Sequence, residues 1–265
     1  MTLQDIYIYP VKSLGGIGLH EALTEEKGLK YDRRWMLVDN ERNFLTQRTI
    51  PELALLKAIP EIDGLRIINK NKPDDELFIP YGTASENELS VQIWGDVVLS
   101  KEVSIEASHW FTNAIGKSCR MVVMPEKVRR PVDPTYAVNK ESVSFADGMP
   151  YLLIGQSSLD DLNSKLDAPL PMDRFRPNLV FSGAEPFAED TWKTIRIGEC
   201  IFQIVKPCAR CVITTINQET AEQGKEPLRT LSKFRKTDTK VMFGQNMVLL
   251  EGNRIRVGDE VIPVE

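Results

Sequence analysis

The chain has 265 residues, 42% of them apolar and 27% charged, which fits one large domain or two closely packed domains and excludes a disordered or fibrous protein. Asp and Glu (38) outnumber Lys and Arg (33), so the net charge is -5 and nucleic acid is not an expected partner. Because no stretch approaches the ~20 apolar residues of a membrane span and the first residues do not resemble a signal peptide, we expect a cytoplasmic protein with no membrane span.

Short β-rich runs separated by Gly, Pro, Asn and Asp predict a barrel-like or mixed β-rich architecture, not alternating β-α-β units. The polar stretch 69–76 indicates an exposed hairpin or loop. In chain order, the predicted strands cover residues 6–9, 35–38, 65–68, 120–124, 151–154, 178–181, 201–206, 210–216, 247–250 and 260–264.

Helices are fewer. Apolar residues at helical spacing predict one helix over 107–115, ending at Gly116. A second is expected to begin at Ser157 as N-cap and to carry Leu159, Leu162 and Leu166 on one face. A third is expected to begin at Pro227.

Residues 9–13 (YPVKS) and the following Gly15 and Gly16 form the first polar cluster. A glycine-rich turn that carries Lys12 and Ser13 could hold an anion through backbone N–H groups and a point charge. The nucleotide-binding pattern G-x-x-x-x-G-K-[ST] is absent, and an ordinary turn is the simpler interpretation.

Arginines provide two further candidates. Arg33 and Arg34 precede a predicted strand, with Arg48 shortly after, and neighbouring side chains of a strand point to opposite sides, so at most one of the pair enters a site. Arg176 precedes a proline and is therefore expected to be extended, with Asn178 two residues later on the same face. The alternatives are a solvent-facing charge pair and a loop end.

The four cysteines are too few for a disulfide scaffold and suit a reducing compartment. Cys208 and Cys211 have the C-x-x-C spacing of a zinc site, a dithiol pair or one reactive thiolate, and two buried apolar cysteines are the simplest alternative. We expect the flanking Lys206 and Arg210 to stabilise a thiolate here. A thiolate with few histidines nearby favours metal ligation over cysteine hydrolase chemistry.

As a set, these segments resemble the MOSC-domain family, in particular the mitochondrial amidoxime-reducing component and its bacterial counterparts. The motifs occur in the family's order: 9–13 (YPVKS), 32–35 (DRRW), 94–96 (WGD), 175–178 (FRPN), 207–211 (PCARC) with Thr214 and Thr215, 226–228 (EPL) and 243–245 (FGQ). The resemblance implies a β-rich α+β fold, in which a MOSC N-terminal β-barrel domain packs on a barrel-like MOSC domain with a few helices. A charged, proline-containing segment at 125–134 places the boundary near residue 125, giving domains 1–125 and 126–265.

The resemblance also implies a bound molybdenum cofactor. Cys211 matches the family's molybdenum ligand and therefore the catalytic position, whereas Cys208 matches a cysteine that is not the ligand. The positions that match the pterin- and phosphate-binding residues of the family are Lys12, Ser13, Arg33, Arg176, Asn178 and Arg210. The chain departs from close relatives at 148–150 (GMP), where hydroxyl residues precede the proline, and at Ala209, where a serine can occur.

The implied activity is a two-electron reduction of small N-hydroxylated or N-oxygenated substrates, with the substrate oxygen leaving as water. No iron-sulfur cysteine pattern such as C-x4-C-x2-C is present, so a separate flavin or iron-sulfur protein is expected as electron donor. The alternatives are a sulfur-carrier or sulfurtransferase role and a non-catalytic cofactor carrier. Descriptions of the family also mention pyridoxal phosphate, but no pyridoxal-binding domain and no Schiff-base lysine can be singled out.

Overall fold

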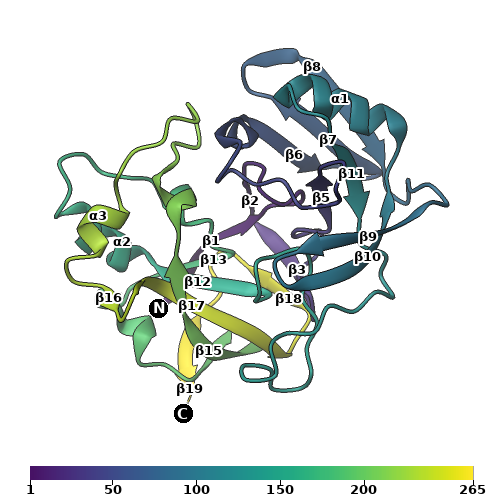
Figure 1. Ribbon diagram of the computed structural model, residues 1–265. Coiled ribbons are helices and arrows are strands. Elements are labelled where there is room, and N and C mark those ends of the chain that lie inside the picture. Colours follow the sequence, from purple (N-terminus) through teal and green to yellow (C-terminus); the bar gives the residue numbers. More distant parts are fainter. Residues whose placement is uncertain (265) are drawn as a thin grey trace.

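The computed structural model describes residues 1–264 and has two β-rich parts that lie side by side (Figure 1). One part contains most of residues 30–125, and the other contains most of residues 150–264 together with the N-terminal strand. Strands dominate and helices are few and short, so the predicted β-rich fold class is confirmed.

Nine strands form the largest sheet, in the order β19-β14-β15-β17-β12-β13-β1-β2 with β16 paired to β17. Only β12 and β13 run parallel. The first strand of the chain therefore belongs to a sheet built mainly from the last third of the sequence. The strands are β1 (Thr2–Ile8), β2 (Ile17–Leu19), β12 (Tyr151–Gly155), β13 (Leu179–Ser182), β14 (Thr194–Ile197), β15 (Cys200–Arg210), β16 (Lys236–Thr237), β17 (Lys240–Glu251) and β19 (Val261–Val264).

Three smaller sheets complete the β structure, in the orders β5-β11-β10-β9, β6-β7-β8 and β18-β3-β4. The polar stretch at 69–76 is the turn and first residues of the β7-β8 hairpin, as predicted. The strands are β3 (Glu21–Glu25), β4 (Gly28–Leu29), β5 (Trp35–Val38), β6 (Leu56–Pro60), β7 (Gly64–Asn69), β8 (Lys72–Pro80), β9 (Glu88–Ile93), β10 (Asp96–Glu102), β11 (Arg120–Val123) and β18 (Arg254–Arg256).

The helices are short. They are α1 (Ile105–Ile115), α2 (Gln156–Asn163) and α3 (Leu228–Leu231), with 3-10 turns η1 (Pro51–Leu55), η2 (Met172–Phe175), η3 (Ala188–Asp190) and η4 (Val212–Thr215). Helix α1 is confirmed, with Ser104 as N-cap and Gly116 in the left-handed conformation at φ 66°. Helix α3 follows Pro227 as predicted but is only one turn long. Among the described residues, no helix is long and apolar enough to cross a membrane.

The predicted start of α2 at Ser157 is wrong. The N-cap is Gly155, two residues earlier, and Ser157 makes no capping hydrogen bond. The polar groups at the start of the helix are satisfied by the Glu189 carboxylate instead. It accepts hydrogen bonds from the Gly155 backbone N–H (3.1 Å) and the Ser158 hydroxyl (2.9 Å). Of the predicted leucine face, Leu159 and Leu162 are buried, whereas Leu166 lies beyond the end of the helix and is only partly buried.

The strand predicted over 210–216 is also wrong. Strand β15 ends at Arg210, and the β-branched run that follows forms η4. The Thr214 hydroxyl donates to the Cys211 carbonyl at 3.0 Å, and Thr215 makes the same kind of bond one residue further on. These local side-chain bonds offer the backbone an alternative to the sheet. Cys211 therefore lies just beyond the end of the strand instead of within it.

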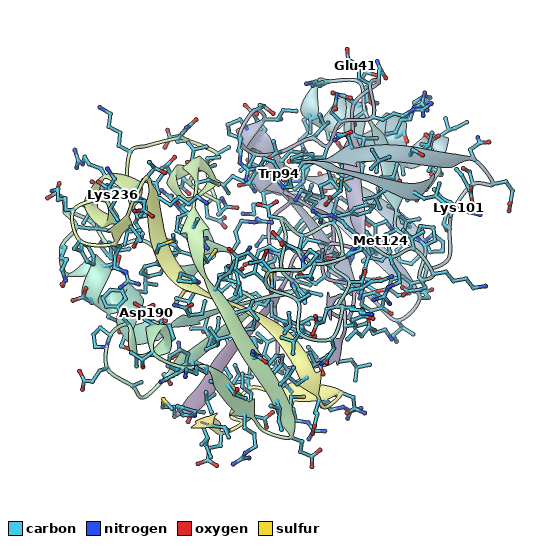
Figure 2. The ribbon with its side chains drawn as sticks, turned by 60° about the horizontal axis from the view of Figure 1, so that its bottom comes forward. Glu41, Trp94, Lys101, Met124, Asp190 and Lys236 are labelled. Atoms are coloured by element: carbon cyan, nitrogen blue, oxygen red, sulfur yellow. The ribbon has the colours of Figure 1, made fainter. Side chains whose placement is uncertain are left out.

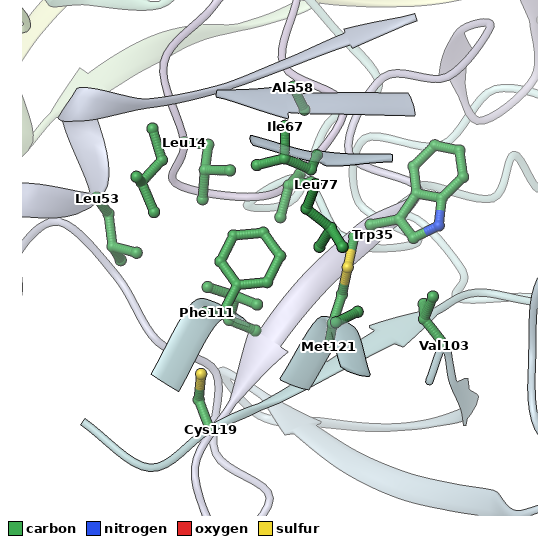
Figure 3. Packing of buried hydrophobic residues seen from close by; sticks show 14 of the residues in the cluster. Leu14, Trp35, Leu53, Ala58, Ile67, Leu77, Val103, Phe111, Cys119 and Met121 are labelled. Atoms are coloured by element: carbon green, nitrogen blue, oxygen red, sulfur yellow. The ribbon is translucent and has the colours of Figure 1, made fainter. Parts of the chain in front are cut away.

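Each part has its own core. Figure 3 shows Phe111 of α1 packed with Leu53, Ile67 and Met121 in the first part. The second core surrounds the large sheet and includes residues of β1. Tyr31 packs against both clusters, so the two parts share an apolar contact. Burial of these side chains fixes the loops that run between the two parts.

Candidate functional site

One cleft is lined by every site residue that the sequence predicts. Its enclosed space is about 140 Å³, and Asp147 and Ala209 lie exposed at its rim. The predicted residues in its lining are Lys12, Ser13, Arg33, Arg176, Asn178, Arg210 and Cys211. Segments far apart in the sequence thus meet here, because β1 inserts into the large sheet next to β13.

Lys12 lies in the loop after β1 and is almost fully buried. Its ammonium donates to the Phe145 carbonyl at 2.8 Å and to the Asp147 carboxylate at 2.5 Å. Burial lowers the pKa of Lys12 to about 8, and the negative charge of Asp147 limits this decrease. Although desolvation acts in the opposite direction, the charges of Lys12 and Arg48 hold the pKa of Asp147 well below its usual range. The pair is therefore ionised at neutral pH.

Only one of the two adjacent arginines enters the cleft, as predicted. Arg33 donates to buried Asp32 at 2.6 Å and to the Asn178 side-chain oxygen at 3.3 Å. Arg34 turns away and pairs with Glu25 at 2.5 Å. Asp32 also accepts from a backbone N–H, which fixes the carboxylate that holds Arg33.

The prediction that Arg176 is extended is wrong. Arg176 adopts the left-handed conformation (φ 53°) at the end of η2, and its guanidinium donates to the Leu14 carbonyl at 2.8 Å. It lies 4.2 Å from the ring centroid of Tyr9, and Arg33 lies 4.3 Å from the same centroid. The ring quadrupole favours both cations in this place. Burial lowers the pKa of Arg176 to about 10, so it stays charged at neutral pH.

Asn178 orients its neighbours. Its side-chain oxygen accepts from the Leu152 backbone N–H (3.2 Å) and from Arg33, and its amide donates to the Tyr7 carbonyl at 3.2 Å. These bonds use most of the capacity of the amide. Asn178 therefore lines the cleft and holds Arg33 in place.

Three site residues have positive φ values, which are uncommon for residues other than glycine. They are Ser13 (69°), Arg33 (51°) and Arg176 (53°). Such conformations cost on the order of 1–3 kcal/mol each and persist where the surroundings over-determine them, most often at functional sites. Their concentration in one cleft supports a binding role for it.

The two cysteines have different arginine partners. The Arg210 guanidinium donates to Cys208 Sγ at 2.9 Å and to the Phe175 carbonyl. Cys211 Sγ instead accepts from Arg48 at 3.4 Å. The expected Lys206 lies 3.9 Å from the ring centroid of Tyr136 and, among the described residues, donates no hydrogen bond to either sulfur. All four cysteines of the chain are free thiols.

Arg48, Asp147 and Trp94 form a group that sequence reasoning did not assign to the site. Asp147 accepts from Arg48 (3.2 Å) and from the Trp94 indole N–H (3.3 Å), in addition to Lys12. Figure 2 shows Trp94 on the side of the first part that is near the second. Trp94 belongs to the 94–96 (WGD) motif and Arg48 follows the arginine pair, but their proximity to Asp147 could not be predicted because the three residues come from separate loops.

Positive charge dominates the cleft. The Nε atom of Arg210 is buried and has no hydrogen-bond partner among the described residues, so its donor capacity is unused within the protein. Counting the lining residues and their direct ion-pair partners Arg48 and Asp32, the cations Lys12, Arg33, Arg48, Arg176 and Arg210 outnumber the carboxylates Asp32 and Asp147. An anionic, planar group with a soft metal suits this donor set, because arginine binds phosphate and flat rings and a thiolate binds soft metals. The residues therefore fit a molybdenum cofactor, which carries a pterin and a phosphate.

Within residues 1–264, no cluster of three or more His, Cys, Asp or Glu side chains could hold a metal ion by itself. The zinc alternative for the C-x-x-C motif would need such a cluster.

Proteins of known name are similar over almost the whole chain. Mitochondrial amidoxime-reducing component 1 of Mus musculus is 33% identical over 98% of this chain and 81% of its own length. Mitochondrial amidoxime reducing component 2 of Homo sapiens is 32% identical over 98% of this chain and 82% of its own. Molybdenum cofactor sulfurase of Arabidopsis thaliana is 32% identical over 98% of this chain, which matches 35% of that longer protein.

Two family models match successive regions of the sequence. The MOSC N-terminal beta barrel domain matches residues 1–118, and the MOSC domain matches residues 140–262. The order agrees with the two β-rich parts of the structure, although β1 and β2, inside the first match, belong to the large sheet of the second part. The chain therefore belongs to the MOSC-domain family, with a MOSC N-terminal β-barrel domain followed by a MOSC domain.

Proposed function

We propose that the protein is a molybdenum-cofactor-dependent oxidoreductase that reduces small N-hydroxylated or N-oxygenated compounds. The observation that carries this proposal is the cleft in which the thiol of Cys211 lies among a surplus of cations, of which Lys12 is buried and the arginines partly buried. The names of the amidoxime-reducing relatives support the reaction class. In the overall reaction, an N–OH group takes up two electrons and two protons and becomes N–H plus water.

Each residue of the cleft has a role in this proposal. Cys211 would hold molybdenum, and the bound cofactor would supply the two-electron reduction. The pterin and its phosphate would be held by Lys12, Ser13, Arg33, Arg176 and Arg210, with Asn178 keeping Arg33 in position. Tyr9 would keep Arg33 and Arg176 apart at fixed places on its ring. Because these groups are fixed before the ligand arrives, little reorganisation accompanies binding.

Two positions depart from close relatives and limit how the cofactor can be contacted. Ala209 and Gly148 both line the cleft without a side-chain hydrogen-bond donor. At these positions only backbone groups could contact the cofactor.

Electrons would come from a separate flavin or iron-sulfur protein. The four cysteines do not form the C-x4-C-x2-C pattern of an iron-sulfur site, and two of them, Cys119 and Cys200, are buried away from the cleft. A cytoplasmic location stays a prediction, since two of the relatives carry the word mitochondrial in their names.

A sulfur-transfer role is the second candidate. The observation that favours it is the sulfurase relative, together with a second thiol, Cys208, in the lining of the same cleft. In that case Cys211 would carry or receive sulfur. A cofactor carrier without catalysis would use the same cations and would not turn over substrate.

One set of assays separates these functions. Protein from a host that makes the molybdenum cofactor is tested for benzamidoxime reduction with a supplied electron donor and for transfer of sulfur from a labelled source. A reductase forms benzamidine, a sulfurtransferase moves sulfur, and a carrier binds the cofactor without doing either. Absence of benzamidine formation by protein that contains molybdenum would contradict the proposal.

A further inference from the structure

The Cys211 sulfur has one hydrogen-bond donor among the described residues, and that donor comes from the other end of the chain. Arg48 donates to Sγ at 3.4 Å, although 163 positions separate the two residues. Arg210, the direct neighbour of Cys211, is occupied by Cys208 and the Phe175 carbonyl. The proximity of Arg48 to this sulfur is thus a product of the fold and not of the motif.

Arg48 is held in place from three sides. Its guanidinium donates to the Thr46 hydroxyl at 3.2 Å and to the Asp147 carboxylate at 3.2 Å. Its other contact is the ring of Trp94, whose centroid lies 4.6 Å away. Trp94 itself donates to Asp147. A side chain fixed in this way cannot easily turn from the sulfur to solvent, and only 20% of it is exposed.

The buried Arg130 fixes the backbone of the loop that carries Asp147. Arg130 donates to the carbonyls of Ser144 (3.0 Å), Ala146 (2.5 Å) and Asp147 (3.2 Å), and so fixes the loop that carries the carboxylate. Its Nε atom donates to Asp96 at 2.7 Å, which ties this loop to the β9-β10 turn that carries Trp94. Arg130 thus holds the backbone at Asp147, the Asp147 carboxylate holds Arg48, and Arg48 donates to the Cys211 sulfur.

We infer that Arg48 is a positioning residue for Cys211: it directs the sulfur into the cleft and tunes its electron donation to the metal. The inference rests on the proposed function. A charged N–H donor draws electron density from a ligating sulfur and so disfavours the oxidised metal. The reduction potential of the bound metal is therefore higher with Arg48 than without it.

The test uses full-length protein from a cofactor-competent host, as wild type, Arg48→Met and Arg48→Lys. Lys206→Met is the matched control, because Lys206 is the nearest cation in sequence that, among the described residues, donates no hydrogen bond to either sulfur. Molybdenum and pterin contents, the melting temperature and the reduction potential of the metal are measured for each. The potential is a property that a purely structural role of Arg48 would leave unchanged.

We expect Arg48→Met to favour the oxidised metal at least tenfold, a shift of about 30 mV to more negative potential for a two-electron couple. Arg48→Lys, which keeps the charge, should shift it less, and Lys206→Met should not shift it. Loss of molybdenum with retention of pterin in Arg48→Met would also support the inference, because it would report a misdirected sulfur.

Two results would overturn the inference alone. One is an unchanged potential in loaded Arg48→Met, and the other is loss of both molybdenum and pterin from both Arg48 variants at an unchanged melting temperature. Wild-type protein without molybdenum would overturn the proposed function and this inference together. The two failures are therefore distinguishable.

Discussion

Two of the cavities in the molecule differ in a way that shows what marks a site. The cleft at Cys211 is small, about 140 Å³, and charged. A pocket in the first part is larger, about 460 Å³, and is lined by the aromatic residues Tyr31, Trp35 and Tyr81. Tyr31 and Tyr81 stack with ring centroids 4.7 Å apart, and the Arg34 charge in its wall is paired with Glu25.

Size is a poor guide to the site, because a third cavity of about 510 Å³, next to Gly15 and Gly16, is larger than both. In the wall of the aromatic pocket Arg34 is paired with Glu25, whereas the cleft and its direct partners hold five cations against two carboxylates and keep a buried donor, Arg210 Nε, without a partner among the described residues. Unbalanced charge held in fixed geometry has an energetic cost that only an anionic ligand offsets. The chemistry of the lining is therefore the better guide, and the predictions below compare the two cavities.

The largest expected effect is at the thiol. Cys211→Ala should abolish molybdenum-dependent activity, a loss greater than the ~10–100-fold caused by outer ligand partners. Cys208→Ala, which lies in the same cleft but pairs with Arg210, should retain much of the activity. Turnover of benzamidoxime per protein molecule measures both. Equal losses in the two folded variants would contradict a single sulfur ligand.

A smaller effect is expected from the cleft arginines. Arg176→Met removes a buried guanidinium, and a charge-assisted hydrogen bond contributes about 1.5–3 kcal/mol, so cofactor affinity should fall roughly 10–100-fold. Arg34→Met is the matched control, because it lies in the wall of the aromatic pocket. Pterin content after extended dialysis compares the two. If Arg34→Met lost pterin as readily as Arg176→Met, the result would contradict the proposal that the cleft, and not the aromatic pocket, holds the cofactor.

The pH dependence of anion binding tests Lys12. Above about pH 8 the Lys12 ammonium loses its proton, so the affinity of cofactor-free protein for sulfate should fall by up to about tenfold per pH unit. Lys12→Arg should remove this decrease, since arginine stays charged. Calorimetric titration with sulfate from pH 7 to pH 9.5 measures it at constant sulfate charge. A flat profile in the wild type would place the lowered pKa of Lys12 in doubt.

The same pKa has a stability consequence of defined sign. Between about pH 8 and the unfolded value of 10.5, the unfolded chain binds more protons at Lys12 than the folded chain does. The contribution of Lys12 to the free energy of unfolding therefore rises with pH in this window.

The smallest effect belongs to the aromatic pocket. The Tyr81 hydroxyl is buried and has no hydrogen-bond partner among the described residues. Tyr81→Phe should leave the free energy of unfolding unchanged or raise it by up to about 1 kcal/mol, because an unsatisfied polar group is removed. Chemical denaturation measures this, and molybdenum content should not change. A clear loss of stability would mean that the hydroxyl has a favourable role.

The sequence predicted the fold class and the members of the site better than their geometry. Ordered motifs identified Lys12, Arg33, Arg176 and Cys211, and the structure brings all four to one cleft. The backbone of Arg176 was predicted wrongly, because its left-handed conformation depends on the stacking and hydrogen bonds that its side chain makes with distant residues.

Contacts between distant loops were beyond the reach of local patterns. The proximity of Arg48 to Cys211, and of Asp147 to Lys12, exists only after β1 has inserted into the large sheet and the loop at 144–147 has been fixed by Arg130. The prediction of a strand over residues 210–216 was wrong for a related reason. Threonine hydroxyls that bond to nearby carbonyls overrode the β propensity of the run.

The most direct test of the central claim is the molybdenum and pterin content of protein freshly purified from a cofactor-competent host, measured beside Cys211→Ala. The cationic cleft and its thiol predict nearly one molybdenum per wild-type chain and none in the variant. Wild-type protein from such a host with neither molybdenum nor pterin would contradict the account. It would favour the alternative function, sulfur transfer at the same thiol.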